Sequence, residues 1–236
     1  MMSSIVRTGY WMSARSLGGV LALWGILNGS MPGRAVAETS LDAVASSREP
    51  WQQHKVKHGI SVERRAVKGS SFFEYRASIG IPMAPALLIE DMWRTVTLKP
   101  GPLVKKRQIL KQNDTEIVFY DQIQTPVVSD RDYTMRLRKV VLGNDRFQMV
   151  FETANELGPG PDPKHVRILA IHGAWSLEPD PSVAGGSLVT YQSYSEPGGS
   201  VPAFMIHGAQ VDQTIKSVET LKARILAAQN PPSSSK

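Results

Sequence analysis

The chain contains no cysteine among its 236 residues. Disulfide bonds, a thiol nucleophile and a lipidated N-terminal cysteine are therefore excluded. Of the five histidines, His54 and His58 are four residues apart, but no glutamate follows His54 as a metalloprotease helix requires. The chain also lacks a glycine-rich phosphate loop and a Gly-x-Ser-x-Gly nucleophile turn. The sequence gives little support for catalysis and predicts neither a metal nor a cofactor.

Long hydrophobic runs are absent except near the N-terminus. The segment Leu17 to Leu27 is apolar but too short to span a bilayer as a helix. Arg7 and Arg15 precede it, and the tripeptide Ala35-Val36-Ala37 is a small-residue cleavage site. This order predicts a secretory signal peptide over residues 1–37, cleaved after Ala37, with an uncleaved membrane anchor as the alternative. We therefore expect a periplasmic or secreted protein.

The excess of positive over negative charge is small once this leader is set aside. The whole chain has a net charge of +6, and loss of Arg7, Arg15 and Arg34 lowers it to +3. We expect no nucleic-acid partner, while a mildly basic surface suits transient contact with an anionic membrane. The rest is long enough for one domain with a sizeable core, which we place at residues 38–229 and expect to be a monomer. A disordered tail is expected at residues 230–236.

The remaining pattern is mostly that of β-strands. After a helix at residues 41–57 and strands at residues 60–67 and 72–81, a second helix is expected at residues 84–93. Six strands follow, at residues 104–111, 115–124, 131–142, 146–154, 166–177 and 187–195. Short connections forbid parallel pairing, so the fold class is α+β with one antiparallel sheet, which must curl. A long helix at residues 203–228 carries a stripe of Thr214, Val218, Leu221 and Ile225 and then lies across the concave face.

Several short segments occur in a characteristic order and spacing. They are Gly59-Ile60-Ser61-Val62, Ile117-Val118-Phe119-Tyr120-Asp121, Ser129-Asp130-Arg131-Asp132-Tyr133, Gly173-Ala174-Trp175-Ser176-Leu177-Glu178-Pro179 and Glu196-Pro197-Gly198-Gly199-Ser200-Val201-Pro202-Ala203-Phe204. Over residues 51–228 the chain resembles the StAR-related lipid-transfer (START) domain. The resemblance implies a helix-grip fold, a curved antiparallel sheet gripping the long C-terminal helix around a hydrophobic cavity for one lipid. It also implies a lid made from that helix and a long loop, here residues 155–165.

The polar chemistry of the family carries over only in part. Sterol-binding animal members pair a buried acid with an arginine; the acid falls on Asp121, but the arginine position falls on Leu137. Asp121 shares a strand face with Phe119, so an unpaired carboxylate there would be costly to bury. We expect Arg131 to be its partner, with both residues at the polar end of the pocket beside a lipid hydroxyl or head group. A structural ion pair at a sheet edge is the alternative.

The other candidate ligand-binding residues are aromatic or flexible apolar side chains on expected inward faces. Methionine suits such a wall because it adapts to varied shapes, although each position also fits a solid core. With the two charged residues, the candidates are Phe73, Tyr75, Asp121, Arg131, Tyr133, Met135, Leu137, Met149, Phe151, Phe204 and Met205. Arg167, in contrast, is expected to be a structural hydrogen-bonding residue.

These observations favour a protein that binds a lipid over one that transforms it. We expect binding and intermembrane transfer of a single hydrophobic lipid, sterol-like or phospholipid, driven by burial of about 25 cal/mol per Å² of apolar area. One alternative is a cavity enzyme of the aromatase/cyclase type on the same fold, for which only Asp121, Arg131 and Tyr133 offer acid–base groups. Another is a binding module that senses a lipid and signals to a partner.

Overall fold

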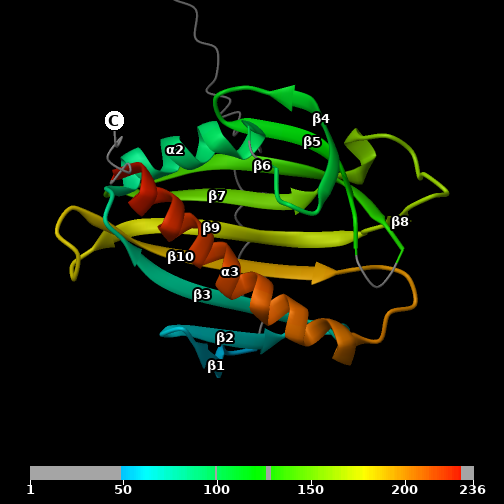
Figure 1. Ribbon diagram of the computed structural model, residues 1–236, viewed down its shortest axis with the longest axis horizontal. Helices are drawn as coiled ribbons and strands as arrows, with labels where there is room; N and C mark the ends of the chain where they lie inside the picture. Colours follow the sequence, from blue (N-terminus) through cyan, green and yellow to red (C-terminus); the bar gives the residue numbers. More distant parts are fainter. Residues whose placement is uncertain (1–48, 99, 126–128, 230–236) are drawn as a thin grey trace, which may run out of the picture. The chain divides into compact units, whose positions relative to one another are not determined.

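The structure of the protein is a computed structural model that describes residues 49–98, 100–125 and 129–229 (Figure 1). All of these residues belong to one compact unit of the chain, residues 43–236. The signal peptide expected at residues 1–37 and the tail expected at residues 230–236 lie outside the described residues. Within the described ranges, no helix has both the length and the apolar character needed to span a membrane.

A single ten-stranded sheet forms the body of this unit. Its order is β1-β2-β3-β10-β9-β7-β6-β5-β4, with the short β8 paired to β6. The strands are β1 (Gln52–Lys57), β2 (Ile60–Ala66), β3 (Phe73–Ile81), β4 (Val104–Gln112), β5 (Glu116–Ile123), β6 (Arg131–Gly143), β7 (Arg146–Thr153), β8 (Val166–Arg167), β9 (Ala170–Asp180) and β10 (Gly186–Glu196). Neighbours along the sheet are antiparallel, which confirms the expected class.

Two expected elements are wrong in the described residues, although residues 41–48 of the first, the helix expected at residues 41–57, lie outside them. Residues 52–57 form the edge strand β1 and not the end of a helix; a turn with positive φ at His58 and Gly59 returns the chain to β2. This strand is exposed on both faces, so its sequence lacks the alternation that identifies strands. The single strand expected at residues 166–177 is two strands, β8 and β9. The first runs parallel to the start of β6, an exception to the antiparallel pattern.

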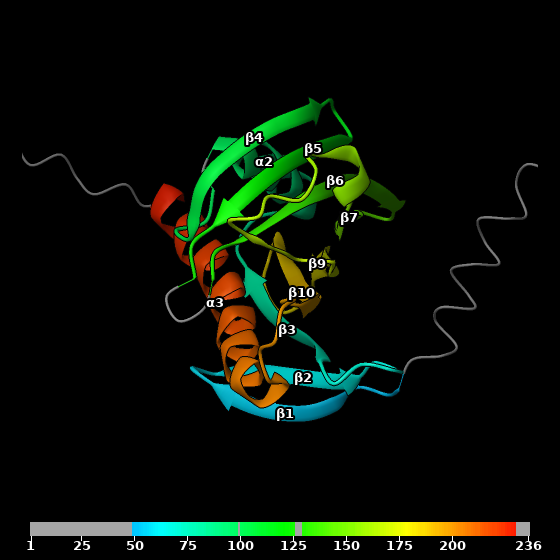
Figure 2. The same cartoon turned by 90° about the vertical axis from the view of Figure 1, so that its right-hand side faces the viewer.

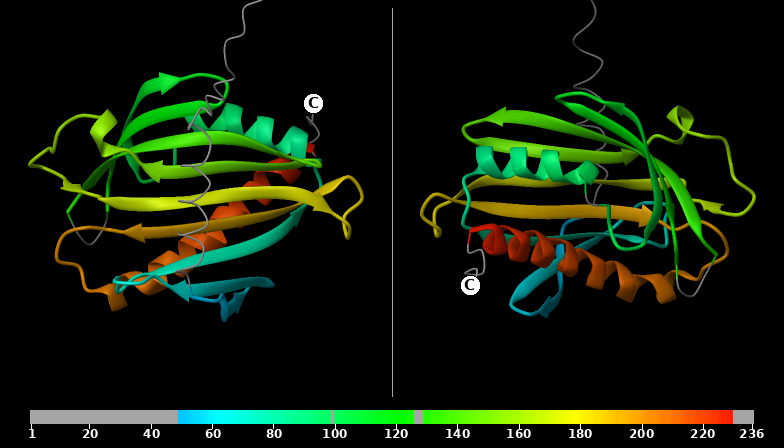
Figure 3. Two further views of the ribbon diagram at one scale, coloured as in Figure 1. Left: turned by 180° about the vertical axis from the view of Figure 1, so that it is seen from behind. Right: turned by 45° about the horizontal axis from the view of Figure 1, so that its top comes forward.

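Two helices lie on the same face of the sheet (Figure 3). α2 (Pro85–Leu98) begins at a proline, as suits a first helical turn, and packs against β7, β9 and β10. α3 (Ala203–Gln229) crosses the sheet and packs on β2, β3 and β10. It buries Val211, Thr214, Ile215, Val218, Leu221 and Ile225, which include the whole expected stripe. Figure 2 shows the sheet curving around α3 from β1 to β4, the expected helix-grip arrangement.

Candidate functional site

A cavity of about 780 Å³ lies between α3 and the sheet. Strands β5, β6, β7 and β9 supply most of one wall, α3 and β10 supply another, and residues 101–104 close a side. The strand wall is mainly apolar, with Phe119, Met135 and Phe151 among its side chains. The volume is in the range of about 300–1,000 Å³ typical of small-molecule sites. The arrangement can therefore enclose one largely apolar molecule.

Six of the eleven candidate residues line this cavity. Alternation along β6 and β7 turns every second side chain inward, which brings their candidates together. The six are Tyr75, Tyr133, Met135, Leu137, Met149 and Phe151. Whether they touch a ligand remains a prediction.

Three aromatic or apolar candidates lie elsewhere. Phe204 and Met205, in the first turn of α3, are 77% and 52% exposed and do not line the cavity. Beyond them the helix packs on the sheet through His207, whose ring lies 5.1 Å from the ring of Phe73, while Phe204 and Met205 are on its exposed side. The ring of Phe73 thus packs against His207 and against Arg64, whose guanidinium lies 4.4 Å from the ring centre. The expectation that these three form the cavity wall is wrong.

Asp121 is fully buried, but its partner is not the expected one. Arg107 of β4 lies directly opposite in the β4–β5 hairpin and holds both carboxylate oxygens. Its Nε donates to Oδ1 at 2.7 Å and its Nη2 to Oδ2 at 2.6 Å. The Tyr133 hydroxyl also donates to Oδ2, at 3.2 Å. Sequence reasoning missed Arg107, although it stands on the strand that precedes β5.

Arg131 pairs with Ile123 across β5 and β6, whereas Asp121 faces Tyr133. The Arg131 guanidinium donates to Thr125 Oγ1 at 3.3 Å and also to the Ser129 carbonyl. The predicted Asp121–Arg131 pair is therefore wrong, because strand register separates the two side chains. Arg131 thus forms hydrogen bonds with the segment that precedes β6 and does not line the cavity.

The charged and polar groups of the Arg107–Asp121–Tyr133 cluster find their hydrogen-bond partners within the protein. Arg107 Nη1 donates to the Val96 carbonyl at 2.7 Å, and the guanidinium lies 3.9 Å over the Phe119 ring. Burial, followed by the negative charge of Asp121, raises the pKa of Tyr133, so its phenol stays neutral and remains a donor. The carboxylate has its charge balanced and both oxygens engaged. The cluster thus presents no free charge to the cavity.

The wall formed by α3 and β10 is polar. From α3 come Gln210, Gln213, Lys216, Ser217 and Thr220, and from β10 come Tyr191, Ser193 and Ser195. Gln210 Nε2 donates to the Ser195 carbonyl at 2.8 Å, while its buried Oε1 has no hydrogen-bond partner. Burial raises the pKa of Tyr191, and hydrogen bonding with Ser193 and Ser217 opposes this effect. Sequence reasoning considered only the apolar stripe of this helix and missed its polar neighbour.

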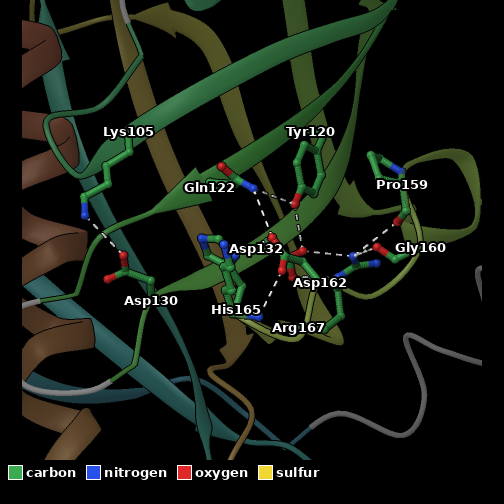
Figure 4. A network of polar contacts seen from close by, with 11 residues as sticks. Lys105, Tyr120, Gln122, Asp130, Asp132, Pro159, Gly160, Asp162, His165 and Arg167 are labelled. Atoms are coloured by element: carbon green, nitrogen blue, oxygen red, sulfur yellow. Dashed lines mark hydrogen bonds and ion pairs between the residues drawn. The ribbon is translucent and has the colours of Figure 1, made fainter.

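A second polar network occupies the opposite face of the sheet (Figure 4). Arg167 donates to Asp132 through Nε at 2.7 Å and Nη2 at 2.9 Å, and its Nη2 also reaches the carbonyls of Pro159 and Gly160. Tyr120 donates to Asp132 Oδ2 at 2.8 Å. The structural role expected for Arg167 is confirmed. The long loop is tied to the face away from the cavity, so it does not form the expected lid.

The Asp132 network makes stability depend on pH. Burial alone would raise the pKa of Asp132, but hydrogen bonds from Arg167 and Tyr120 hold it below its usual value. Because the pKa of Asp132 is lower in the folded than in the unfolded state, where it is about 3.9, the ionised carboxylate stabilises the fold above that pH. This stabilisation is lost as the pH falls through the folded-state pKa. In urea titrations at neutral and acidic pH, Asp132→Asn should be less stable at neutral pH and lose less on acidification. Asp145→Asn, at an exposed turn, should lose as much stability on acidification as the unmodified protein. If Asp132→Asn also lost as much as the unmodified protein, the pH dependence would not come from Asp132.

Comparisons with known proteins place the chain among related sequences and structures. No protein-family profile matches it. It is 26% identical to an uncharacterised protein of Pseudomonas aeruginosa, covering 84% of this chain and 96% of that protein. It is 25% identical to the mouse phosphatidylcholine transfer protein, covering 67% and 76%. Among solved structures, the STAR-related lipid transfer protein of Xanthomonas axonopodis is 27% identical with a TM-score of 0.65, covering 75% of this chain and 99% of that one.

Proposed function

We propose that this chain, which has the helix-grip fold of the START domain, binds one hydrophobic lipid in its cavity and carries it between membranes. The resemblance to that family is confirmed, since the two relatives named as lipid-transfer proteins cover 75% and 67% of this chain. The observation that carries the proposal is the cavity of about 780 Å³ with a largely apolar strand wall. Burying a lipid there would gain about 25 cal/mol per Å² of apolar area.

The state of the buried acid favours binding over catalysis. An aromatase/cyclase-type enzyme would need a free acid or base in contact with its substrate. Asp121 has both oxygens engaged by Arg107 and Tyr133, and Arg131 lies outside the cavity lining. Among the described residues that line the cavity, none is a carboxylate or a histidine. A sensing module remains the other alternative, and it would hold lipid without passing it between vesicles.

The test is to purify the protein, extract it with organic solvent and identify co-purified lipid by mass spectrometry. Protein freed of lipid is then assayed for transfer between donor and acceptor vesicles. We also propose export, which the sequence of residues 1–37 supports, and transient membrane contact, which the mildly basic charge of the remaining chain supports. The protein mass in the same experiment should correspond to a chain that begins at Glu38.

A cavity-filling variant makes this test specific. Met135 lines the cavity, so Met135→Trp should place an indole in the space for the ligand and reduce co-purified lipid by about tenfold or more. Val141→Trp lies on the same strand at a 69% exposed position and should leave lipid loading unchanged. Equal loading of both variants, with both folded by circular dichroism, would rule out this cavity as the binding site.

A further inference from the structure

The polar wall of the cavity has a regular pattern on α3. Gln210, Gln213, Ser217 and Thr220 recur at helical spacing and form one stripe toward the cavity. A neighbouring stripe, including Val211 and Val218, is buried against the sheet. Gln213 and Ser217 hydrogen-bond to each other. Gln210 Nε2 donates to the Ser195 carbonyl, but the buried Gln210 Oε1 has no partner. A wholly apolar ligand would leave this oxygen unpaired and would cover the polar groups of the stripe that now face water, which is costly. The polar part of the ligand therefore belongs beside α3, opposite the apolar strands.

The mouth of the cavity lies along the same helix. Leu103 lines the cavity and is 48% exposed, and residues 101 and 102 beside it are exposed as well. On the helix, Gln213, Lys216 and Thr220 also line the cavity and are exposed. The opening is thus between residues 101–103 and the middle of α3. A head group at this opening would stay in contact with water while the apolar part of the molecule fills the interior.

Lys216 gives this mouth a positive charge. It is the only charged side chain among the described residues that line the cavity. The two acids within one helical turn of it are already paired with β1 and its turn: Asp212 with Lys57 at 2.9 Å, and Glu219 with His58 at 2.7 Å. The Arg107–Asp121 pair adds no net charge. The mouth therefore holds one ammonium group whose nearest acids on α3 are engaged elsewhere.

We infer that the ligand is an amphiphile with one anionic head group, which lies at Lys216 while the apolar part packs on the strand wall. This inference rests on the proposed function and narrows its ligand class. The shared chemistry is an anionic oxygen group, supplied by either a carboxylate or a phosphate. Gln213 directs one side-chain N–H at Ser217, and its second N–H would donate a hydrogen bond to the same group.

The test compares lipids of equal chain length whose head groups are either anionic or neutral. A fluorescent fatty acid and its methyl ester form one pair, and lysophosphatidic acid and a monoacylglycerol of the same chain length form the other. At low salt, the lipid-free protein should bind the anionic member of at least one pair about threefold to tenfold more tightly than its neutral partner. Which pair shows the larger preference separates a carboxylate from a phosphate. Added salt should reduce the preference.

Lys216→Met should abolish the preference by weakening the binding of the anionic lipid while leaving the affinity for the neutral lipid unchanged. Lys222→Met makes the same exchange on α3 at a residue outside the cavity lining, and it should keep the preference. Equal affinity for both members of each pair in the unmodified protein would overturn the inference and leave the lipid carrier intact. Loss of anionic and neutral binding alike in Lys216→Met would also overturn it. Failure of the proposed function differs, because then none of the four lipids binds and none co-purifies.

Discussion

Arg107→Met should lower the free energy of unfolding by about 3–5 kcal/mol, because it leaves the buried Asp121 carboxylate without its counter-charge. The effect is large because Asp121 is fully buried and Arg107 is only 12% exposed. Tyr133 would remain as a donor to Asp121, but one neutral hydrogen bond does not replace a bidentate guanidinium. Urea denaturation at neutral pH measures the loss.

Two further variants define the cause. Arg107→Met combined with Asp121→Leu removes both charges, so the double variant should lose less stability than Arg107→Met alone. Lys111→Met breaks the Lys111–Glu116 pair in the same hairpin, where Lys111 is exposed, and should cost less than about 1 kcal/mol. If Arg107→Met lowered the free energy of unfolding no more than Lys111→Met does, the buried pair would contribute no more to stability than an exposed pair.

Gly173→Ala should cost about 2–3 kcal/mol or more, because the added methyl group has no space. A Cβ at Gly173 would lie 2.1 Å from the Gln192 carbonyl oxygen and 2.6 Å from Cζ of Phe151. The carbonyl belongs to the backbone of β10, which pairs with β9 along its length, so it has little freedom to retreat. The Phe151 ring lines the cavity, and its displacement should also weaken lipid loading.

A glycine-to-alanine substitution in α3 is a control that should change stability in the opposite direction. Gly208 is in α3 with open space at its Cβ position, so Gly208→Ala should raise stability by about 0.5–1 kcal/mol through helix propensity. Thermal denaturation of both variants compares them directly. A Gly173→Ala protein as stable as the unmodified one would mean that β9 and β10 are further apart than the structure places them.

Regular elements made much of the fold and site predictable. The alternation along β6 identifies Tyr133, Met135 and Leu137 as inward residues, and all three line the cavity. The helical period likewise identifies Val218 and Ile225 as buried on α3. In both cases the geometry of one element fixes which residues share a face. Packing against a neighbouring element then only has to decide which face is inside.

Irregular positions explain what the sequence did not predict. On β4 the half-buried residues Val104, Arg107 and Leu110 are three apart, not two, because bulges at Lys105 and Leu110 shift the register. Alternation therefore could not place Arg107 opposite Asp121. The outward position of Phe204 in turn depends on how the first turn of α3 docks on β3, which helical periodicity does not determine.

The bulges have a consequence at the two edges of the sheet that the described residues form. The edge strands are β1 and β4, and each carries the extra residue of its bulges: His54 in β1, and Lys105 and Leu110 in β4. Exposed edges offer unpaired backbone groups to other chains, and bulges and lysines are known to block such strand addition. β1 carries Lys55 and Lys57, and β4 carries three lysines. A sheet with two open edges is thereby protected against edge-to-edge aggregation.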